Sequence, residues 1–139
     1  MAQLVRELMT SDPETLPVDA TVQQAAQRMR DRGIGDVLVI EDGRLCGIAT
    51  DRDIVVRALA EREDLSGTRL GEVCSEQIVT ASPNEDADNA IARMREHAIR
   101  RIAVVDEGRP VGVLSIGDAA VERDPRSALG DISAARANA

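Results

Sequence analysis

Two short stretches of the sequence carry a hydroxyl residue followed three positions later by a carboxylate. The first pair is Thr50 and Asp53, and the second is Ser115 and Asp118, 65 positions further along the chain. A hydroxyl can donate a hydrogen bond to a phosphate or sugar oxygen, and a carboxylate can accept hydrogen bonds from both hydroxyls of a ribose. The duplicated pair is therefore the best candidate for chemistry in this chain.

The same spacing also has a purely structural explanation. A hydroxyl residue at a helix start, followed three residues later by an acidic residue, forms a capping box, although Glu is commoner than Asp at that place. If a strand leads into the helix, the free N–H groups of the first turn point toward the end of that strand and can bind an anion. Gly47 and Gly112 precede the two pairs and allow close approach of backbone. The residues alone leave capping and ligand binding both open.

The two stretches belong to a longer internal repeat. At a constant offset of 65 positions, without a gap, identical residues recur as Thr15/Thr80, Ala25/Ala90, Arg28/Arg93, Met29/Met94, Ile34/Ile99, Val39/Val104, Gly43/Gly108, Gly47/Gly112 and Asp53/Asp118. Repeats of about 60 residues are marginal alone and bury their faces against each other. We therefore predict one pseudo-twofold module, in which the two hydroxyl–carboxylate sites face a common cleft. Repeat 1 is assigned to residues 1–64, repeat 2 to 65–124 and a tail to 125–139.

Each repeat has the same predicted order of elements: a helical turn, an extended piece, a helix, a buried strand, a hairpin turn, a returning strand and a second helix. In repeat 1 these elements fall at 5–9, 14–18, 21–32, 37–40, 41–44, 45–49 and from Thr50, and in repeat 2 at 70–74, 78–81, 87–97, 102–105, 106–109, 111–114 and from Ser115. We predict Asp19 and Asn84 as helix N-caps, Gly33 as a C-cap and a hairpin turn centred on Asp42 and Gly43. The tail could form a short helix over 127–133.

Composition narrows the possible partners. The 139 residues include 43% hydrophobic residues and no Phe, Tyr or Trp, so the core must be aliphatic. Nucleic-acid readers that stack bases on aromatic side chains are excluded. The net charge of -8 repels nucleic acid and anionic membranes. No apolar run is long enough to span a bilayer, and the first residues do not resemble a secretion signal. We predict a cytoplasmic protein without nucleic-acid or membrane partners.

Catalytic and metal-binding patterns are missing from the sequence. The two cysteines, Cys46 and Cys74, form no CxxC motif, and His97 is the single histidine. The two cysteines are typical of buried thiols in a reducing compartment, and a disulfide between them or a metal site is disfavoured. The sequence also has no recognisable nucleophile–base pair and no Walker-type loop. We expect no enzyme activity and no required cofactor.

The residues do resemble a known family. The apolar strand that ends in an acid, the Asp-Gly-Arg turn at 42–44 and the run Gly-Ile-Ala-Thr-Asp-Arg-Asp at 47–53 are similar to the cystathionine-β-synthase (CBS) domain, and the run at 95–106 is similar to that family's middle signature. The resemblance covers roughly residues 4–123. It implies a stand-alone tandem CBS pair, or Bateman module, of mixed α/β (α+β) class. Two βαββα repeats would pack through their sheets, and two modules would pair into a flat homodimer.

The resemblance also implies a function. CBS pairs usually sense adenosyl ligands such as AMP, ADP, ATP or S-adenosylmethionine, and pass the signal on by dimer rearrangement or through a regulated partner protein. In the family, the Asp of the motif holds the ribose. The first extended piece and the residues before the buried strand hold the base, and basic residues before that strand meet phosphates. Carried onto this chain, one pocket would combine Thr50 and Asp53 with Val79 and Thr80. The other would combine Ser115 and Asp118 with Thr15, Ile34 and Gly35, and the residues before the second buried strand are Ile99, Arg100 and Arg101.

Departures from the family pattern predict that the two pockets are unequal. Leu38 and Ala103 stand where the family usually has proline. Asp36 precedes the first buried strand and would repel a phosphate, whereas Arg100 and Arg101 precede the second and would attract one. Two alternatives remain open: that the two arginines only pair with surface acids, and that the protein is an interaction module with vestigial nucleotide sites.

Overall fold

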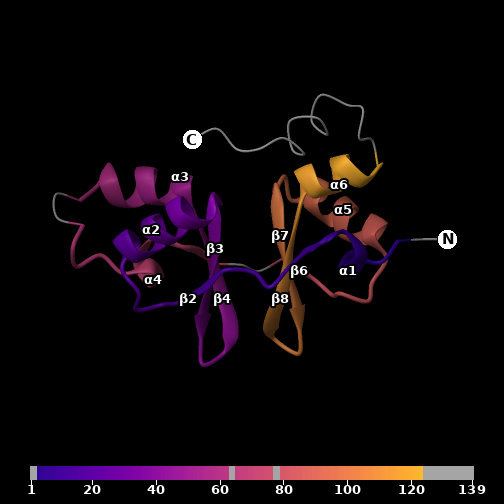
Figure 1. Cartoon of the computed structure of the whole chain (residues 1–139), viewed down its shortest axis with the longest axis horizontal. Helices are drawn as coiled ribbons and strands as arrows, with labels where there is room; N and C mark the ends of the chain where they lie inside the picture. Colours follow the sequence, from indigo (N-terminus) through magenta and orange to yellow (C-terminus); the bar gives the residue numbers. More distant parts are fainter. Residues whose placement is uncertain (1–2, 63–64, 77–78, 124–139) are drawn as a thin grey trace. The chain divides into compact units, whose positions relative to one another are not determined.

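The computed structural model describes residues 3–62, 65–76 and 79–123 and divides the chain into two compact units (Figure 1). Unit 2 contains residues 14–78, and unit 1 contains residues 1–13 together with 79–139. The mixed α and β fold predicted from the sequence is confirmed in both units. The predicted tail at 125–139, with its possible helix, lies outside the described residues.

Unit 2 contains a mixed four-stranded sheet covered by helices. Its strands lie in the order β2-β3-β4-β5, with β2 parallel to β3 and the other pairs antiparallel. Helix α2 contacts β3, and helix α4 contacts β4 (Figure 1). The elements in chain order are β2 (Thr15–Pro17), α2 (Val22–Arg32), β3 (Asp36–Glu41), β4 (Arg44–Thr50), α3 (Asp51–Asp53), the π-helix η1 (Ile54–Leu59), α4 (Leu70–Val73) and β5 (Ser75–Glu76).

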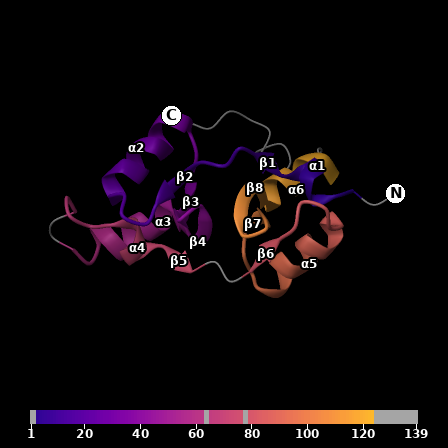
Figure 2. The ribbon, with the colours of Figure 1, turned by 90° about the horizontal axis from the view of Figure 1, so that it is seen from below.

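Unit 1 repeats this design with a segment from the chain's N-terminal end. Its sheet has the order β1-β8-β7-β6, so the short strand β1 takes the place that β5 has in unit 2. Helix α1 contacts α5 and α6 within the same unit (Figure 2). Residues 5–11, which the sequence assigned to repeat 1, therefore belong to the unit that holds most of repeat 2. The elements are α1 (Val5–Leu8), β1 (Thr10–Ser11), β6 (Thr80–Ala81), α5 (Ala87–Glu96), β7 (Arg101–Asp106), β8 (Arg109–Ser115) and α6 (Ile116–Arg123).

Both hairpins turn through left-handed backbone. Asp42 and Gly43 have φ values of 54° and 78°, and Glu107 and Gly108 have φ values of 53° and 82°. Two successive positive φ values are the signature of a two-residue turn that matches the twist of the strands, which Asp-Gly favours. The predicted hairpin at Asp42 and Gly43 is thus confirmed, and each hairpin aligns its two strands for the sites described below.

The helix N-caps differ from the predicted ones. Thr21 rather than Asp19 caps α2, because its hydroxyl accepts from the Gln24 N–H at 3.1 Å while the Gln24 side chain accepts from the Thr21 N–H at 2.8 Å. Asp86 rather than Asn84 caps α5 by accepting from the Asp88 N–H at 2.8 Å. Both real caps lie two residues closer to the helix than the predicted ones, since only there does the side chain reach the free amides of the first turn. Gly33, with φ 65°, ends α2 as predicted.

Each unit has its own aliphatic core. Helix α2 directs Val22, Ala25 and Met29 inward, and α5 does the same with Ala87, Ala90 and Met94. The remaining buried members are Leu16, Ala20, Val37, Val39, Ala49, Ala58, Leu70 and Val73 in unit 2, and Val5, Leu8, Ala81, Ile102, Val104 and Leu114 in unit 1. The duplicated core explains why the hydrophobic pattern of the sequence repeats without a gap.

We predict that the Glu85–Arg93 ion pair makes unit 1 sensitive to acid. Arg93 donates to the Glu85 carboxylate at 2.7 and 3.3 Å and to the Thr80 carbonyl at 2.8 Å. Burial opposes ionisation of Glu85, but the hydrogen bonds from Arg93 and from the Ser82 amide outweigh it and lower the pKa of that carboxyl. Because the folded-state pKa lies below the unfolded value, the stabilisation is complete above pH 5 or so and disappears as the pH falls through the folded-state pKa.

Glu85→Gln should therefore lower the free energy of unfolding by about 1–2 kcal/mol at pH 7, and the difference from the parent protein should shrink below about pH 4. Urea denaturation at several pH values measures this difference. Glu96→Gln is the matched control, because Glu96 is an exposed residue at the C-terminal end of α5, the helix that begins two residues after Glu85. A Glu85→Gln deficit that stayed constant down to pH 3 would contradict the prediction.

Candidate functional site

Both hydroxyl–carboxylate pairs form capping boxes at a strand-to-helix junction. In unit 2 the Asp53 N–H donates to Thr50 Oγ1 at 3.1 Å, and the Thr50 N–H donates to Asp53 Oδ2 at 2.9 Å. In unit 1 the Asp118 N–H donates to Ser115 Oγ at 3.0 Å, and the Ser115 N–H donates to Asp118 Oδ2 at 3.2 Å. The capping interpretation is confirmed, and it uses one carboxylate oxygen of each Asp.

The second carboxylate oxygen distinguishes the two junctions. Asp53 Oδ1 lies 3.8 Å from Nε of Arg57, one turn further along the helix. Asp118 Oδ1 has no hydrogen bond or ion pair with any residue that the structure describes, since the Thr10 hydroxyl, at a long 3.5 Å, approaches Oδ2 instead. Asp118 therefore keeps an acceptor available for a ligand, whereas the corresponding oxygen of Asp53 faces a cation.

The strands beside the two junctions carry side chains of opposite charge. Asp36 is the register partner of Thr50 across β3 and β4, and Arg101 is the register partner of Ser115 across β7 and β8. The preceding carbonyls play identical roles: Gly35 accepts from the Asp51 N–H and Arg100 accepts from the Ile116 N–H, each at 3.0 Å. The two backbones are equivalent, so the difference in charge comes from side chains alone.

The arginines beside Ser115 differ in their surroundings. The Arg100 side chain is exposed and makes no ion pair within the described part of the chain. Arg101 is half-buried and has an interaction partner. The alternative that both arginines only pair with surface acids thus fails for Arg100 among the described residues. A guanidinium presents several fixed donors that suit phosphate oxygens, so this edge of unit 1 favours an anion.

The predicted binding residues divide between the two units. Unit 2 holds Thr15, paired with Leu38, together with Ile34, Gly35, Thr50 and Asp53, and unit 1 holds Thr80, paired with Ala103, together with Val79, Ile99, Arg100, Arg101, Ser115 and Asp118. Within each unit, the first residues of the two parallel strands lie at the same end of the sheet as the last residues of the antiparallel strand β4 or β8. Each predicted pocket combines residues from both units, and that combination stays a prediction.

Thr10 lies beside the candidate site and was not predicted from the sequence. It lies on β1, whose register partner Val113 is on β8, and its hydroxyl approaches Asp118. The repeat-equivalent residue is Ser75 on β5, which pairs with Ile48 in unit 2. The recurrence of a hydroxyl at the 65-residue offset was the available signal.

The remaining polar groups do not form a catalytic or metal centre in the described residues. Cys46 and Cys74 are not joined in a disulfide. Burial raises the pKa of Cys46, and the neighbouring Cys74 and Glu41 raise it further, so its thiolate is disfavoured. Within residues 3–62, 65–76 and 79–123, no three His, Cys, Asp or Glu side chains are placed to hold a metal ion. Over the same residues no helix has the length and apolar character needed to cross a bilayer.

Comparison with known proteins identifies relatives along almost the whole chain. The family model described as CBS domain matches residues 5–59 and 70–122. The CBS domain-containing protein YhcV of Bacillus subtilis is 36% identical over 126 residues, which cover 91% of this chain and 89% of YhcV.

Solved structures agree with this assignment. Hypoxic Response Protein I, crystallised with two coordinated zinc ions, matches with a TM-score of 0.77 and 33% identity over 85% of this chain and 97% of its own. The CBS domain pair of protein MJ0100, in complex with 5′-methylthioadenosine and S-adenosyl-L-methionine, matches with a TM-score of 0.75 and 26% identity over 85% of this chain and 97% of its own.

Proposed function

The chain belongs to the CBS domain family, and we propose that it is a regulatory module that binds an adenosyl ligand: AMP, ADP, ATP or S-adenosylmethionine. The ligand would lie in a cleft between the two repeats, and the signal would pass through rearrangement of a homodimer or through a regulated partner protein. No catalytic step is assigned to the site, because its hydroxyls and carboxylates are used in capping and in binding.

One observation carries this proposal. Asp118 uses Oδ2 to cap α6 and keeps Oδ1 free of any described partner, at a helix start flanked by Arg101. A carboxylate oxygen so placed can accept a ribose hydroxyl, and a nearby guanidinium can meet a phosphate or carboxylate of the same ligand. The adenosyl compounds held by the MJ0100 domain pair, a relative with the same fold, support this ligand class.

The charge difference between the units extends the proposal to two unequal sites. The site built on Ser115, Asp118, Arg100 and Arg101 would take a phosphorylated nucleotide. The site built on Thr50 and Asp53 has Asp36 on the adjacent strand, so it would stay empty or take a less charged adenosyl compound. The residues predicted to hold the base are Thr15, Ile34 and Gly35 for one site and Val79, Thr80 and Ile99 for the other.

A second candidate function is an interaction protein of the same fold with vestigial nucleotide sites. Two features favour it: Leu38 and Ala103 replace the prolines that are usual in the family, and Asp36 lies opposite Thr50. A ligand screen separates the two candidates.

In that screen, AMP, ADP, ATP, S-adenosylmethionine and NAD are each added before thermal unfolding. A ligand present at 100 times its Kd stabilises the folded state by about 2.7 kcal/mol. For a chain of this size we expect a rise in Tm of roughly 5–10 °C with at least one of these ligands. Inorganic phosphate at equal ionic strength is the control for a general anion effect. An unchanged Tm with all five compounds at millimolar concentration would favour the vestigial-site alternative.

A further inference from the structure

Both cysteines of the chain lie against the same hydrophobic core in unit 2, although they are far apart in the sequence. Cys46 is on β4, and Cys74 directly follows α4 and precedes β5. The strands β4 and β5 are antiparallel neighbours, with Gly47 opposite Glu76 and Ile48 opposite Ser75. The fold therefore brings the two thiols to neighbouring segments of one sheet.

Two local features place the thiols beside one another. The register of β3 and β4 shifts by one residue at Cys46, so this residue is the bulged one and has no partner on β3. Gly47 has no side chain, and Cys74 Sγ lies where one would be, 2.9 Å from the position of a Cβ. The sulfur of Cys74 thus lies over the residue that directly follows Cys46. The electrostatic effect of Cys74 on the pKa of Cys46 agrees with this proximity.

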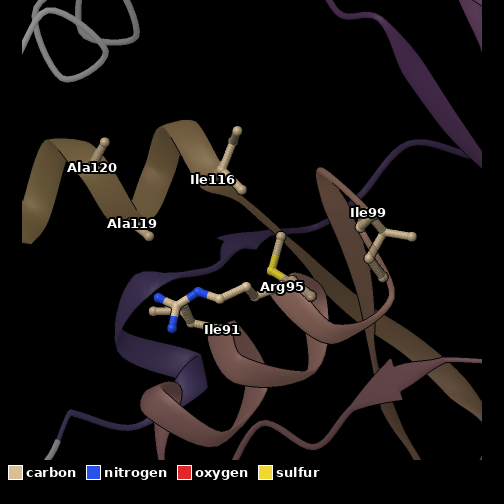
Figure 3. A pocket seen from close by; sticks show the side chains of 8 residues that line it. Ile91, Arg95, Ile99, Ile116, Ala119 and Ala120 are labelled. Carbon is tan, nitrogen blue, oxygen red and sulfur yellow. The ribbon is translucent and has the colours of Figure 1, made fainter.

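Unit 1 has no thiol at the corresponding positions. At the 65-residue offset, Cys46 corresponds to Val111 and Cys74 to Met9. Met9 lies over the glycine of β8 as Cys74 lies over the glycine of β4, and Val111 packs on the core of unit 1. The surface groove between α5 and α6 of that unit is lined by aliphatic side chains, a methionine and Arg95, also without a thiol (Figure 3). Sulfhydryl groups are thus confined to unit 2, at two positions where packing alone does not require them.

We propose that Cys46 and Cys74 are a redox-active pair that forms a reversible disulfide within one chain and so joins the end of α4 to β4. The oxidant is a small disulfide such as oxidised glutathione. A thiolate of the pair attacks one sulfur of that disulfide, releases one small thiolate and forms a mixed disulfide. The second cysteine, as a thiolate, then attacks the protein sulfur of the mixed disulfide and releases the other small thiolate. The pair loses two protons and two electrons, and the small disulfide becomes two thiols.

The disulfide exchanges one hydrogen bond for a covalent link. In the reduced protein the Cys46 S–H donates to the Val39 carbonyl oxygen at 3.2 Å, and oxidation removes that proton. Burial and the nearby Glu41 disfavour a charged sulfur at this place, whereas a disulfide carries no charge. The segment after α4 is otherwise held to β4 by β5, a strand of two residues. A covalent link therefore reinforces a short contact and closes a loop in the unfolded chain.

Treatment of the folded protein with oxidised glutathione, followed by tryptic digestion and mass spectrometry, tests the pair. We expect the chain to lose two hydrogens and to retain no glutathione. The tryptic peptides 45–52 and 70–93, which hold one cysteine each, should be recovered as one linked species. The Tm of the oxidised protein should be roughly 5–10 °C higher, because the link constrains the unfolded chain. Dithiothreitol should return both the mass and the Tm to their starting values.

Cys46→Val and Cys74→Met are the matched controls, since each introduces the residue of unit 1 at the corresponding position and leaves one thiol. Each variant should keep glutathione as a mixed disulfide or stay reduced, and its Tm should not rise on oxidation. Glutathione retained on both cysteines of the parent chain, a link between two copies, or thiols that react only after unfolding in urea would each overturn the proposal. A linked pair without a rise in Tm would show that the bond does not reinforce the contact of α4 with β4.

Discussion

Gly112→Val is expected to destabilise unit 1 by about 3 kcal/mol, near the upper end of the cost of overpacking a well-packed site. A Cβ at Gly112 would lie 2.9 Å from the Thr10 carbonyl oxygen and 2.5 Å from Met9 Sδ. The methionine side chain can rotate away, but the Thr10 carbonyl belongs to the backbone of β1. The substitution can be accommodated only if β1 moves away from β8, and urea denaturation measures the resulting loss of stability.

The same substitution in unit 2 gives an internal comparison. A Cβ at Gly47 would lie 2.7 Å from the Ser75 carbonyl oxygen and 2.9 Å from Cys74 Sγ, so Gly47→Val should be similarly destabilising. Gly67→Val is the control, because nothing lies within 4 Å of a Cβ at Gly67, and its effect should stay within about 0.5 kcal/mol. If Gly112→Val were as mild as Gly67→Val, the pairing of β1 with β8 would be wrong.

The surroundings of these glycines could be predicted from the sequence only in part. Close backbone approach at Gly47 and Gly112 was predicted correctly, but the approaching backbone is a two-residue strand rather than an element visible in the hydrophobic pattern. Two residues give no periodicity, so neither β1 nor β5 could be predicted. The repeat also gave no sign that α1 and β1 complete the second repeat's unit. That exchange depends on contacts between residues far apart in the chain.

Elements with local signals were predicted well. The apolar runs at β3 and β7, the Asp-Gly hairpin and the Gly33 cap each depend on a few adjacent residues, and the structure has them where expected. The N-caps at Thr21 and Asp86 were missed because several polar residues precede each helix and only the geometry selects one. The π-helix η1 was also missed, since its apolar residues fit an ordinary α-helix equally well.

The sequence predicted the hydroxyl–carboxylate motif of the candidate site, but only part of the difference between its two copies. The sequence identified Asp36 and Arg101, which the register places opposite Thr50 and Ser115. The contact of Arg57 with the second oxygen of Asp53 was not predicted. Glu122 stands at the position of repeat 2 that corresponds to Arg57, so this difference between the repeats is visible in the sequence. The effect of this difference could be seen only in the structure, which shows that Oδ2 of each Asp caps its helix. Oδ1 is then the oxygen left for a ligand, and its surroundings make the two sites unequal.

Asp118→Asn should therefore lower the affinity for the best adenosyl ligand of the screen by about 10- to 150-fold, which corresponds to the roughly 1.5–3 kcal/mol of a hydrogen bond to a charged acceptor. An Asn side chain has one carbonyl oxygen, which can replace Oδ2 in accepting from the Ser115 N–H, but its NH₂ group cannot accept a ribose hydroxyl. The α6 cap is thus retained while the ligand acceptor is lost. Isothermal titration calorimetry measures the change in affinity.

Asp53→Asn is the control at the equivalent position, where Oδ1 faces Arg57 whereas Asp118 Oδ1 has no described partner, and it should change that affinity by less than about threefold. Arg100→Ala should weaken a phosphorylated ligand, because it removes an exposed guanidinium beside the same site, and should have little effect on one without phosphate. Unfolding without ligand should be nearly unchanged in all three variants, which separates binding from capping. Equal losses of affinity in Asp118→Asn and Asp53→Asn would contradict the inequality of the two sites even if the ligand class proved correct.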